Sequence, residues 1–403
     1  MKGFIINLFS HNIINAINII VPLITYPYII NHLGLSNYGE SVFLIGYFSV
    51  VIVFCEYAFN LTGTKKLSRV RNTNERDMII SQVITSKLYI YIFITPIAFF
   101  SLIGLGKGSF LLIFIGAIIP FSEVINTTWV FIVNNKTKTA AIIVALCRFI
   151  TIPLLYFFVK DTDDLTAYML IYLFVVLSIP ILQIIYLIFV NDVKIRILPK
   201  KHALNALRRG RALFIGRVFS SLKDRYIAIW LGFFSSHEVI AIYDILNKIV
   251  SLLMNPIYSF SIVLFPKLSG RVKGYINFNK LVFFGTITVI FLVTIVSSFS
   301  HLILSYFGSD RLTPYKFELD MFLLAMPLLY ISSLIGSCYL VVNSQYKTYN
   351  FSIILSFGFI VISTNLLYVF NQLDIYFLAC IFLFSSFLEA IVRLYKYLKV
   401  EIK

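Results

Sequence analysis

Residues Phe214–Leu231 read FIGRVFSSLKDRYIAIWL, a stretch long and apolar enough to cross a membrane as a helix. The same stretch carries four charged residues: Arg217, Lys223, Asp224 and Arg225. A charge near the bilayer centre costs roughly 2.5–3.5 kcal/mol on insertion scales, so such residues usually face a wet cavity or a charged partner. Anchoring alone does not need charges at this depth, which favours a function for them.

On a helix, Arg217 and Asp224 share one face because seven residues make about two turns, and Lys223 and Arg225 flank that face. We expect this polar face to line a passage for a large anionic solute. The alternative is that Asp224 and the basic residues only neutralise one another at a helix–helix contact.

Composition places the whole chain in a membrane. Of its 403 residues, 59% are hydrophobic and 13% are charged, whereas soluble domains carry about 25% charged residues. The net charge of +16 does not indicate a nucleic-acid partner, because the basic residues lie in short loops between apolar segments. We therefore expect an all-α integral membrane protein that does not bind nucleic acid.

A spanning helix needs about 20 mostly apolar residues, and the sequence offers twelve such segments. They form a first lobe over 1–190 and a second lobe over 212–403, separated by a basic cytoplasmic linker over 191–211. The predicted spans are 10–31, 40–62, 78–104, 109–133, 139–159, 166–190, 212–232, 239–263, 281–305, 319–342, 348–370 and 374–395.

The loop charges predict the orientation. If the N-terminus is cytoplasmic, most of the 34 Lys and Arg residues lie on the cytoplasmic side. Only four fall in the opposite loops: Lys107, Lys160, Arg311 and Lys316. A positive excess marks the cytoplasmic side, so both termini are expected there.

The two halves share short motifs in the same order. The pattern YIxxxLG begins at Tyr28 and again at Tyr226, and the triplet KLS begins at Lys66 and again at Lys267. Because each half has an even number of spans, the halves are predicted to be parallel repeats with a substrate site in a central cavity between them. The alternative is that the two motif matches arose by chance in an apolar sequence and the halves are not repeats.

Two further predicted helices carry polar stripes at helical spacing. The first helix contributes Asn7, His11, Asn15, Asn18, Pro22 and Thr25, and the eighth contributes Asp244, Asn247, Lys248, Ser251 and Asn255. Asp244 and Lys248 are one turn apart in the orientation that favours an ion pair. These stripes would line a hydrophilic passage, or would serve as hydrogen bonds between helices.

Other charges lie singly inside predicted spans. Lys87 and Arg148 have no acidic neighbour within their own helices, and each would either line a cavity or snorkel to an interface. Glu56 and Glu123 would pair with them, or would bind a coupling proton or sodium ion. Glu389 and Arg393, one turn apart, are expected to form an ion pair near the cytoplasmic end.

Signals for an enzyme are weak. The five His residues are scattered, the four Cys residues show no C-x-x-C spacing, and no outward loop is long enough to build an extracytoplasmic active site. We therefore expect neither a catalytic residue nor a metal site, and no cofactor beyond a coupling H⁺ or Na⁺.

The segment Pro22–Gly39, PLITYPYIINHLGLSNYG, resembles the first-helix signature of bacterial polysaccharide flippases of the O-antigen (Wzx) type. The run EYAFNLTGTKKLSRVR resembles their second helix and basic loop, and DRYIAIWLG, IYDILNKI and VLFPKLSG resemble their second lobe. The likeness extends over essentially the whole chain.

This resemblance implies two six-helix lobes around a cationic cavity in the bacterial inner membrane. It also implies a substrate, an undecaprenyl-diphosphate-linked oligosaccharide moved from the cytoplasmic to the outer leaflet by alternating access. A polysaccharide polymerase and a chain-length regulator would be partners. By position, we expect the diphosphate to meet Arg217, Lys223, Arg225 and Lys248, with Lys87 and Arg148 as further basic candidates and Asn15 and Asn18 facing sugar hydroxyls. Asp224, Asp244, Glu56 and Glu123 are the expected coupling or ion-pair residues.

The alternatives are a multidrug/cation antiporter of the same superfamily, a major-facilitator transporter, a scaffold and a membrane polysaccharide polymerase. An antiporter should carry an acid in its first helix, where this chain has Asn and His. The loop GTKKLSRVRNTNER lacks the acidic-glycine motif of the major-facilitator class.

Overall fold

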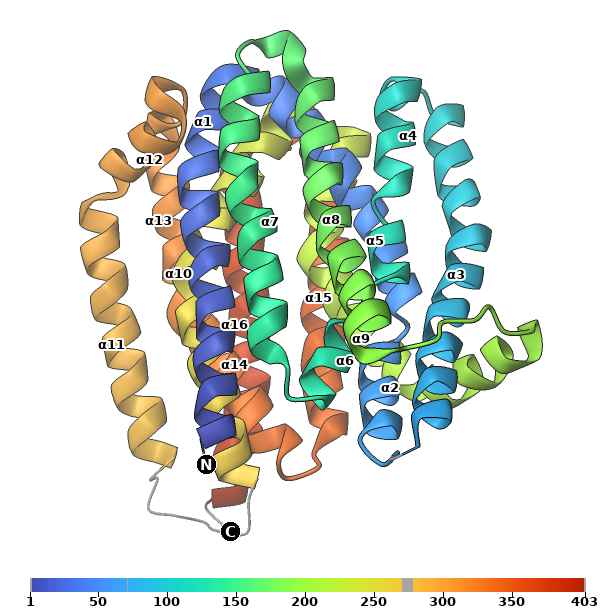
Figure 1. The fold of residues 1–403 in the computed structure, drawn as a ribbon. Coiled ribbons are helices and arrows are strands. Elements are labelled where there is room, and N and C mark those ends of the chain that lie inside the picture. Colours follow the sequence, from blue (N-terminus) through green and yellow to red (C-terminus); the bar gives the residue numbers. More distant parts are fainter. Residues whose placement is uncertain (1, 71, 270–277, 402–403) are drawn as a thin grey trace. The chain divides into compact units, whose positions relative to one another are not determined.

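The computed structural model describes residues 2–70, 72–269 and 278–401, which are almost entirely helical (Figure 1). No strand occurs within these ranges. The helices are α1 (Lys2–Glu56), α2 (Phe59–Leu67), α3 (Thr73–Gly104), α4 (Phe110–Ile118), α5 (Phe121–Val124), α6 (Thr128–Val133), α7 (Thr137–Phe158), α8 (Leu165–Asn191), α9 (Lys200–Phe234), α10 (His237–Ser269), α11 (Phe278–Ser298), α12 (Ser300–Gly308), α13 (Lys316–Leu324), α14 (Met326–Ile335), α15 (Tyr346–Val369) and α16 (Ile375–Glu401), with a π-helical turn at Gly336–Val341.

Ten helical stretches in the described residues are long and apolar enough to span a membrane. Nine correspond one to one to predicted spans, and the stretch Ile19–Leu67 covers the second predicted span and part of the first. Helix α9 is not among the ten; the part of it whose side chains are described carries Lys223, Asp224 and Arg225. Large apolar side chains such as Phe93, Phe157 and Phe189 are more than 70% exposed, as expected for a surface in contact with lipid.

Gly34 divides α1 into two spans. A continuous helix of 55 residues would be about 80 Å long, far more than the ~30 Å hydrocarbon core. At Gly34 the backbone leaves the helical region, with φ 75° and ψ 167°, a conformation that only glycine adopts readily. The predicted second span is also interrupted, because Tyr57 and Ala58 have positive φ before α2 begins.

Two further predicted spans are broken near a proline. The span predicted over 109–133 consists of α4, α5 and α6, with Pro120 at the start of α5. The span predicted over 319–342 consists of α13, α14 and a π-helical turn, with Pro327 in the first turn of α14. Proline removes a backbone hydrogen bond, which explains breaks at these positions.

The chain forms two compact units. Unit 1 comprises residues 1–25 and 32–221, and unit 2 comprises residues 26–31 and 222–403. The boundary therefore lies inside α9, ten residues after the start of the second lobe that the sequence suggested. The reason is that only residues 192–199 of the predicted linker are non-helical, whereas Lys200 onward continues as helix through Ala-, Leu- and Arg-rich sequence of good helical propensity.

Candidate functional site

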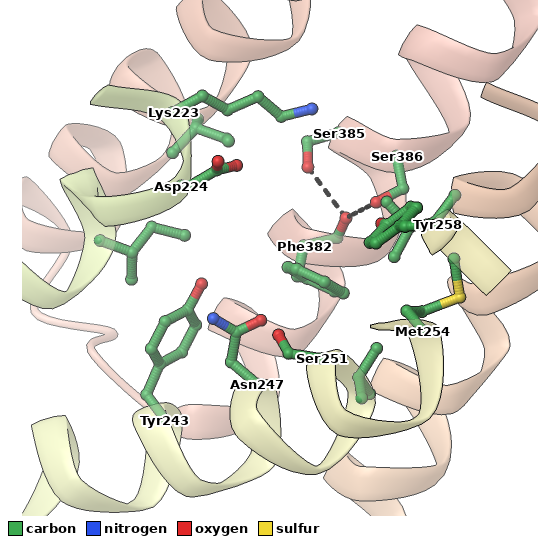
Figure 2. Close-up of a pocket in the computed structure, with 14 residues that line it drawn as sticks. Lys223, Asp224, Tyr243, Asn247, Ser251, Met254, Tyr258, Phe382, Ser385 and Ser386 are labelled. Carbon is green, nitrogen blue, oxygen red and sulfur yellow. Dashed lines mark hydrogen bonds between the residues drawn. The ribbon is translucent and has the colours of Figure 1, made fainter. Parts of the chain in front are cut away.

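A pocket of about 270 Å³ lies inside unit 2, between α9, α10 and α16 (Figure 2). Its charged lining residues among those described are Lys223 and Asp224, both within residues 214–231. The other polar lining side chains are neutral amides, phenols and hydroxyls: Asn247, Tyr243, Tyr258, Ser251, Ser385 and Ser386. Among the described residues, the pocket lining thus combines one cation, one carboxylate and several neutral hydrogen-bonding groups.

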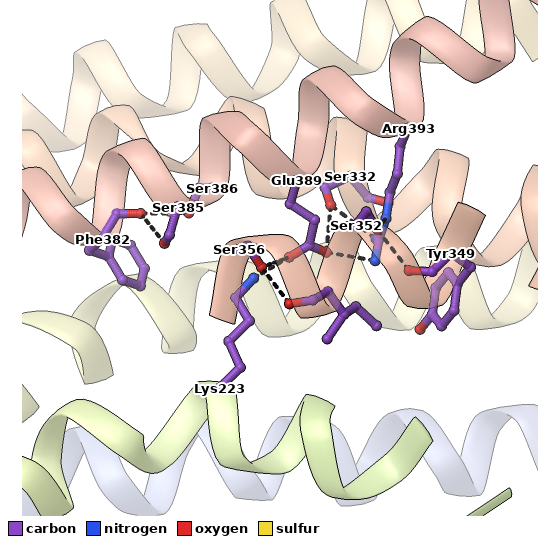
Figure 3. A network of polar contacts seen from close by, with 11 residues as sticks. Lys223, Ser332, Tyr349, Ser352, Ser356, Phe382, Ser385, Ser386, Glu389 and Arg393 are labelled. Carbon is purple, nitrogen blue, oxygen red and sulfur yellow. Dashed lines mark hydrogen bonds and ion pairs between the residues drawn. The ribbon is translucent and has the colours of Figure 1, made fainter. Parts of the chain in front are cut away.

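Lys223 reaches from α9 to α16, where its ammonium group forms an ion pair with Glu389 (Figure 3). Both side chains are largely buried, with 15% and 11% of their surfaces exposed. A buried charge is stable only beside an opposite charge or hydrogen-bond partners, and Lys223 and Glu389 provide opposite charges for each other. From the sequence, Lys223 was predicted to bind substrate. The structure adds that it forms an ion pair with a carboxylate of the same unit, Glu389.

Arg393 holds Glu389 from one turn further along α16. Its Nη2 lies 2.7 Å from Glu389 Oε1, which confirms the ion pair that the spacing predicted. Its Nε donates to Ser352 Oγ at 2.9 Å and its Nη1 donates to the Ser332 carbonyl at 2.7 Å. The guanidinium also lies over the ring of Tyr349, 4.7 Å from the centroid.

Two serines complete the shell around Glu389. The Ser332 hydroxyl accepts a hydrogen bond from Arg393 Nη1 at 2.9 Å and donates one to Glu389 Oε1 at 2.9 Å. Ser356 Oγ lies 3.4 Å from Glu389 Oε2. Glu389 therefore has Arg393, Ser332 and Ser356 as partners in addition to Lys223.

Asp224 on α9 is exposed, whereas Asp244 and Lys248 on α10 pair with each other. Asp224 is exposed and faces the pocket opposite Tyr243 and Asn247 (Figure 2). Lys248 Nζ lies 2.6 Å from Asp244 Oδ2, which confirms the predicted pair one turn apart. Lys248 also lies over the ring of Tyr26, 4.3 Å from the centroid.

A second buried polar network lies inside unit 1. Lys87, which has no exposed surface, places Nζ 2.6 Å from Glu123 Oε1 and 3.0 Å from Asn60 Oδ1. Asn60 Nδ2 is shared between Glu123 at 3.3 Å and Glu56 at 3.2 Å, and Asn126 donates to Glu123 at 2.9 Å. Of the two outcomes considered for Glu123, pairing with Lys87 is confirmed.

The remaining residues predicted to bind substrate have no described contact with the pocket of unit 2 or with the Lys87–Glu123 network. Arg225 is exposed on α9, and Arg148 is half-buried on α7 with a buried Nε that makes no hydrogen bond to the described residues. Arg217, Asn15 and Asn18 lie in helices, but their side chains fall outside the described ones.

Three serines that contact the Glu389–Arg393 pair were not predicted from the sequence: Ser332, Ser352 and Ser356. The available signal was the spacing of Ser352 and Ser356, one turn apart in an apolar helix. Among the described residues, no group of three or more His, Cys, Asp or Glu side chains is placed to hold a metal ion.

Solved structures define the fold class. The chain is similar to the lipid II flippase MurJ in an inward closed conformation, with a TM-score of 0.75 and 17% identity over 98% of this chain and 87% of that one. It is also similar to an inward-facing multidrug resistance MATE family transporter of the MOP superfamily, with a TM-score of 0.65 and 14% identity over 95% and 97%. The protein therefore has the twelve-helix, two-lobe fold of this superfamily.

The family follows from sequence. The model of the polysaccharide biosynthesis protein family matches residues 4–270, and the chain belongs to that family. Two relatives bear the name "Putative O-antigen transporter". The one from Escherichia coli (strain K12) is 26% identical over 66% of this chain and 66% of its own length, just under two thirds. The one from Shigella dysenteriae is 22% identical over 73% and 74%.

Proposed function

We propose that this protein is a flippase for a lipid-linked polysaccharide precursor, and that it acts by transport without chemical conversion. The observation that carries the proposal is family membership over residues 4–270, joined to a pocket in unit 2 where a lysine lies beside the candidate membrane spans of α10 and α16. The similarity to O-antigen transporters and to a lipid II flippase points to the same class of cargo.

The cargo in this proposal is an undecaprenyl-diphosphate-linked oligosaccharide. It enters from the cytoplasmic leaflet of the bacterial inner membrane and leaves by alternating access on the outer leaflet, with both termini of the protein in the cytoplasm. A polymerase and a chain-length regulator would receive the glycan. The pocket of about 270 Å³ lies below the 300–1,000 Å³ typical of sites for drug-sized ligands, so it suits the charged head group and not the whole glycan.

Within this proposal Lys223 changes partner. In the structure it pairs with Glu389; in the proposed mechanism, when a diphosphate enters the pocket, the ammonium turns to the phosphate oxygens. A buried carboxylate left without a countercharge would oppose this exchange. Glu389 would keep a countercharge, however, because Arg393 pairs with it independently of Lys223, and Ser332 and Ser356 would still donate hydrogen bonds to it.

Asp224 is our candidate for the coupling site. It is the carboxylate that lines the pocket, and binding H⁺ or Na⁺ there would remove a negative charge from beside the incoming diphosphate. Glu56, Glu123 and Asp244 have polar or ionic partners within their own units, which favours structural roles for them.

Transport in proteoliposomes tests the proposal. Purified protein is reconstituted with an undecaprenyl-diphosphate-linked oligosaccharide in the inner leaflet, and arrival of the glycan outside is followed with a membrane-impermeant glycosidase. We expect wild-type protein and Lys316→Gln, an exposed control charge on α13, to move the lipid, and Lys223→Gln to slow it at least tenfold. Failure of the wild type to move the lipid would refute the function; equal rates for Lys223→Gln would refute the site alone.

A further inference from the structure

The segment that follows α8 is extended and binds along one face of α3. Lys194 N donates to Asp77 Oδ2 at 3.1 Å, Arg196 N donates to Ser81 Oγ at 3.0 Å and Leu198 N donates to Thr85 Oγ1 at 3.1 Å. Residues 77, 81 and 85 are successive turns of α3, and residues 194, 196 and 198 alternate along an extended chain. We call residues 193–199 the strap.

The same side chains also satisfy strap carbonyl groups. Ser81 Oγ and Thr85 Oγ1 approach the carbonyls of Lys194 and Arg196 at 3.4 Å, and Tyr89 OH approaches that of Leu198 at 3.4 Å. At the far end, Gln82 Nε2 donates to the His202 carbonyl at 2.8 Å. The backbone of the strap is therefore fixed to unit 1 along four turns of α3.

The side chains of the strap divide between core and surface. Val193 is 2% exposed, and Ile195 packs against the same apolar cluster of unit 1. Four basic side chains point outward from the strap and the first turn of α9: Lys194, Arg196, Lys200 and Lys201. The surface between them also carries two apolar residues, Ile197 at 75% exposed and Leu204 at 54% exposed.

The position of the strap along α3 places it at the edge of the bilayer. Helix α3 has 32 residues and is about 48 Å long, so roughly a third of it extends beyond the ~30 Å hydrocarbon core. Its polar part is the N-terminal one, TNERDMIISQVITSK, along which the strap runs, and the part after Lys87 is the more apolar. Counted back from Gly104, the roughly 20 residues that cross the core begin near residue 85, so most of the strap's contacts with α3 lie at or beyond this boundary.

We propose that the strap and the start of α9 form an interfacial binding site for anionic phospholipid. The four basic side chains contact headgroup phosphates, and Ile197 and Leu204 insert among the upper acyl segments. Such a surface binds anionic membranes well, because electrostatic attraction between basic side chains and phosphates adds to the burial of apolar side chains among acyl chains. Because the hydrogen bonds to α3 fix the backbone beforehand, little ordering is required when lipid binds.

The test compares two variants of equal charge. The strap variant is Lys194→Gln/Arg196→Gln/Lys200→Gln/Lys201→Gln, and the control replaces the same number of charges in loops predicted on the opposite side: Lys107→Gln/Lys160→Gln/Arg311→Gln/Lys316→Gln. Each protein is purified in neutral detergent, and binding of phosphatidylglycerol and of phosphatidylcholine is measured by titration at low and high salt.

We expect wild type and control to bind phosphatidylglycerol in a salt-sensitive manner, and the strap variant to bind it at least tenfold more weakly. Equal binding by the strap and control variants, or equal affinity of the wild type for both lipids, would overturn the proposal. If the fourfold variant does not fold, Lys194→Gln/Arg196→Gln replaces it, because both side chains are exposed while their backbone contacts are retained. No transport is measured, so the outcome is independent of the flippase proposal.

Discussion

Replacing Lys87 and Glu123 separately and together measures how much their ion pair stabilises unit 1. Lys87 is fully buried, and its ammonium contacts Glu123 at 2.6 Å and Asn60 at 3.0 Å. The perturbations are Lys87→Met, Glu123→Leu and the double variant, each of which removes charge with little change in side-chain length. Both residues lie far in sequence from the unit 2 pocket, so stability is the direct readout.

The structure sets the expected size of each effect. Among the described residues, Lys87→Met leaves the Glu123 carboxylate with the amides of Asn60 and Asn126 as hydrogen-bond partners, and Glu123→Leu leaves a buried ammonium beside Asn60. Removing one partner of a buried pair costs about 3–5 kcal/mol. The double variant replaces both charges by apolar groups, so it should be destabilised by less than either single variant, because replacing a whole buried pair by apolar residues is often neutral.

Reversible unfolding in mixed detergent micelles provides the free energies of the wild type and the three variants, from which the coupling energy of the pair is obtained. We expect a coupling energy of at least about 3 kcal/mol, because the two single effects share one interaction. If the effects of Lys87→Met and Glu123→Leu added in the double variant, the two charges would not be stabilising one another, and the assignment of Lys87 to a closed ion pair would fail.

Three smaller substitutions probe local features. Gly34→Ala should destabilise the protein by about 1–3 kcal/mol, because φ 75° with ψ 167° is open only to glycine; an unchanged unfolding midpoint would contradict this geometry. Ser332→Ala removes one donor and one acceptor between Arg393 and Glu389 and should cost about 1–3 kcal/mol in the same assay, whereas Ser333→Ala, its half-buried neighbour, should cost less. Gly116→Ala should be destabilising, since a Cβ there would lie 2.6 Å from the Phe48 ring; a stabilised variant would show that the ring moves aside freely.

Features that depend on local spacing were predictable from the sequence. Apolar length identified the spans, and a separation of one helical turn identified the pairs Asp244–Lys248 and Glu389–Arg393. Both rules work because a helix fixes the distance between residues four apart, whatever the rest of the chain does.

Features that depend on tertiary packing were not predictable. Lys223 and Glu389 are 166 residues apart, so nothing near Lys223 in the sequence shows that its charge is already compensated. Lys87 and Glu123 are 36 residues apart, and the sequence left open whether they pair or act separately. The strap was missed for another reason: its partners are ordinary Ser and Thr residues, whose spacing along α3 has meaning only once an extended chain lies beside it.

The most direct test of the central claim is the affinity of the detergent-purified protein for inorganic pyrophosphate, measured by calorimetry in wild type, Lys223→Gln and Glu389→Gln. If Lys223 exchanges Glu389 for a phosphate, Glu389→Gln should tighten pyrophosphate binding because it removes the competing carboxylate. Lys223→Gln should weaken binding because it removes the ammonium. Each effect should be about tenfold or more, since a charge-assisted contact contributes about 1.5–3 kcal/mol. Wild-type affinity in both variants, or weaker binding in Glu389→Gln, would contradict the account.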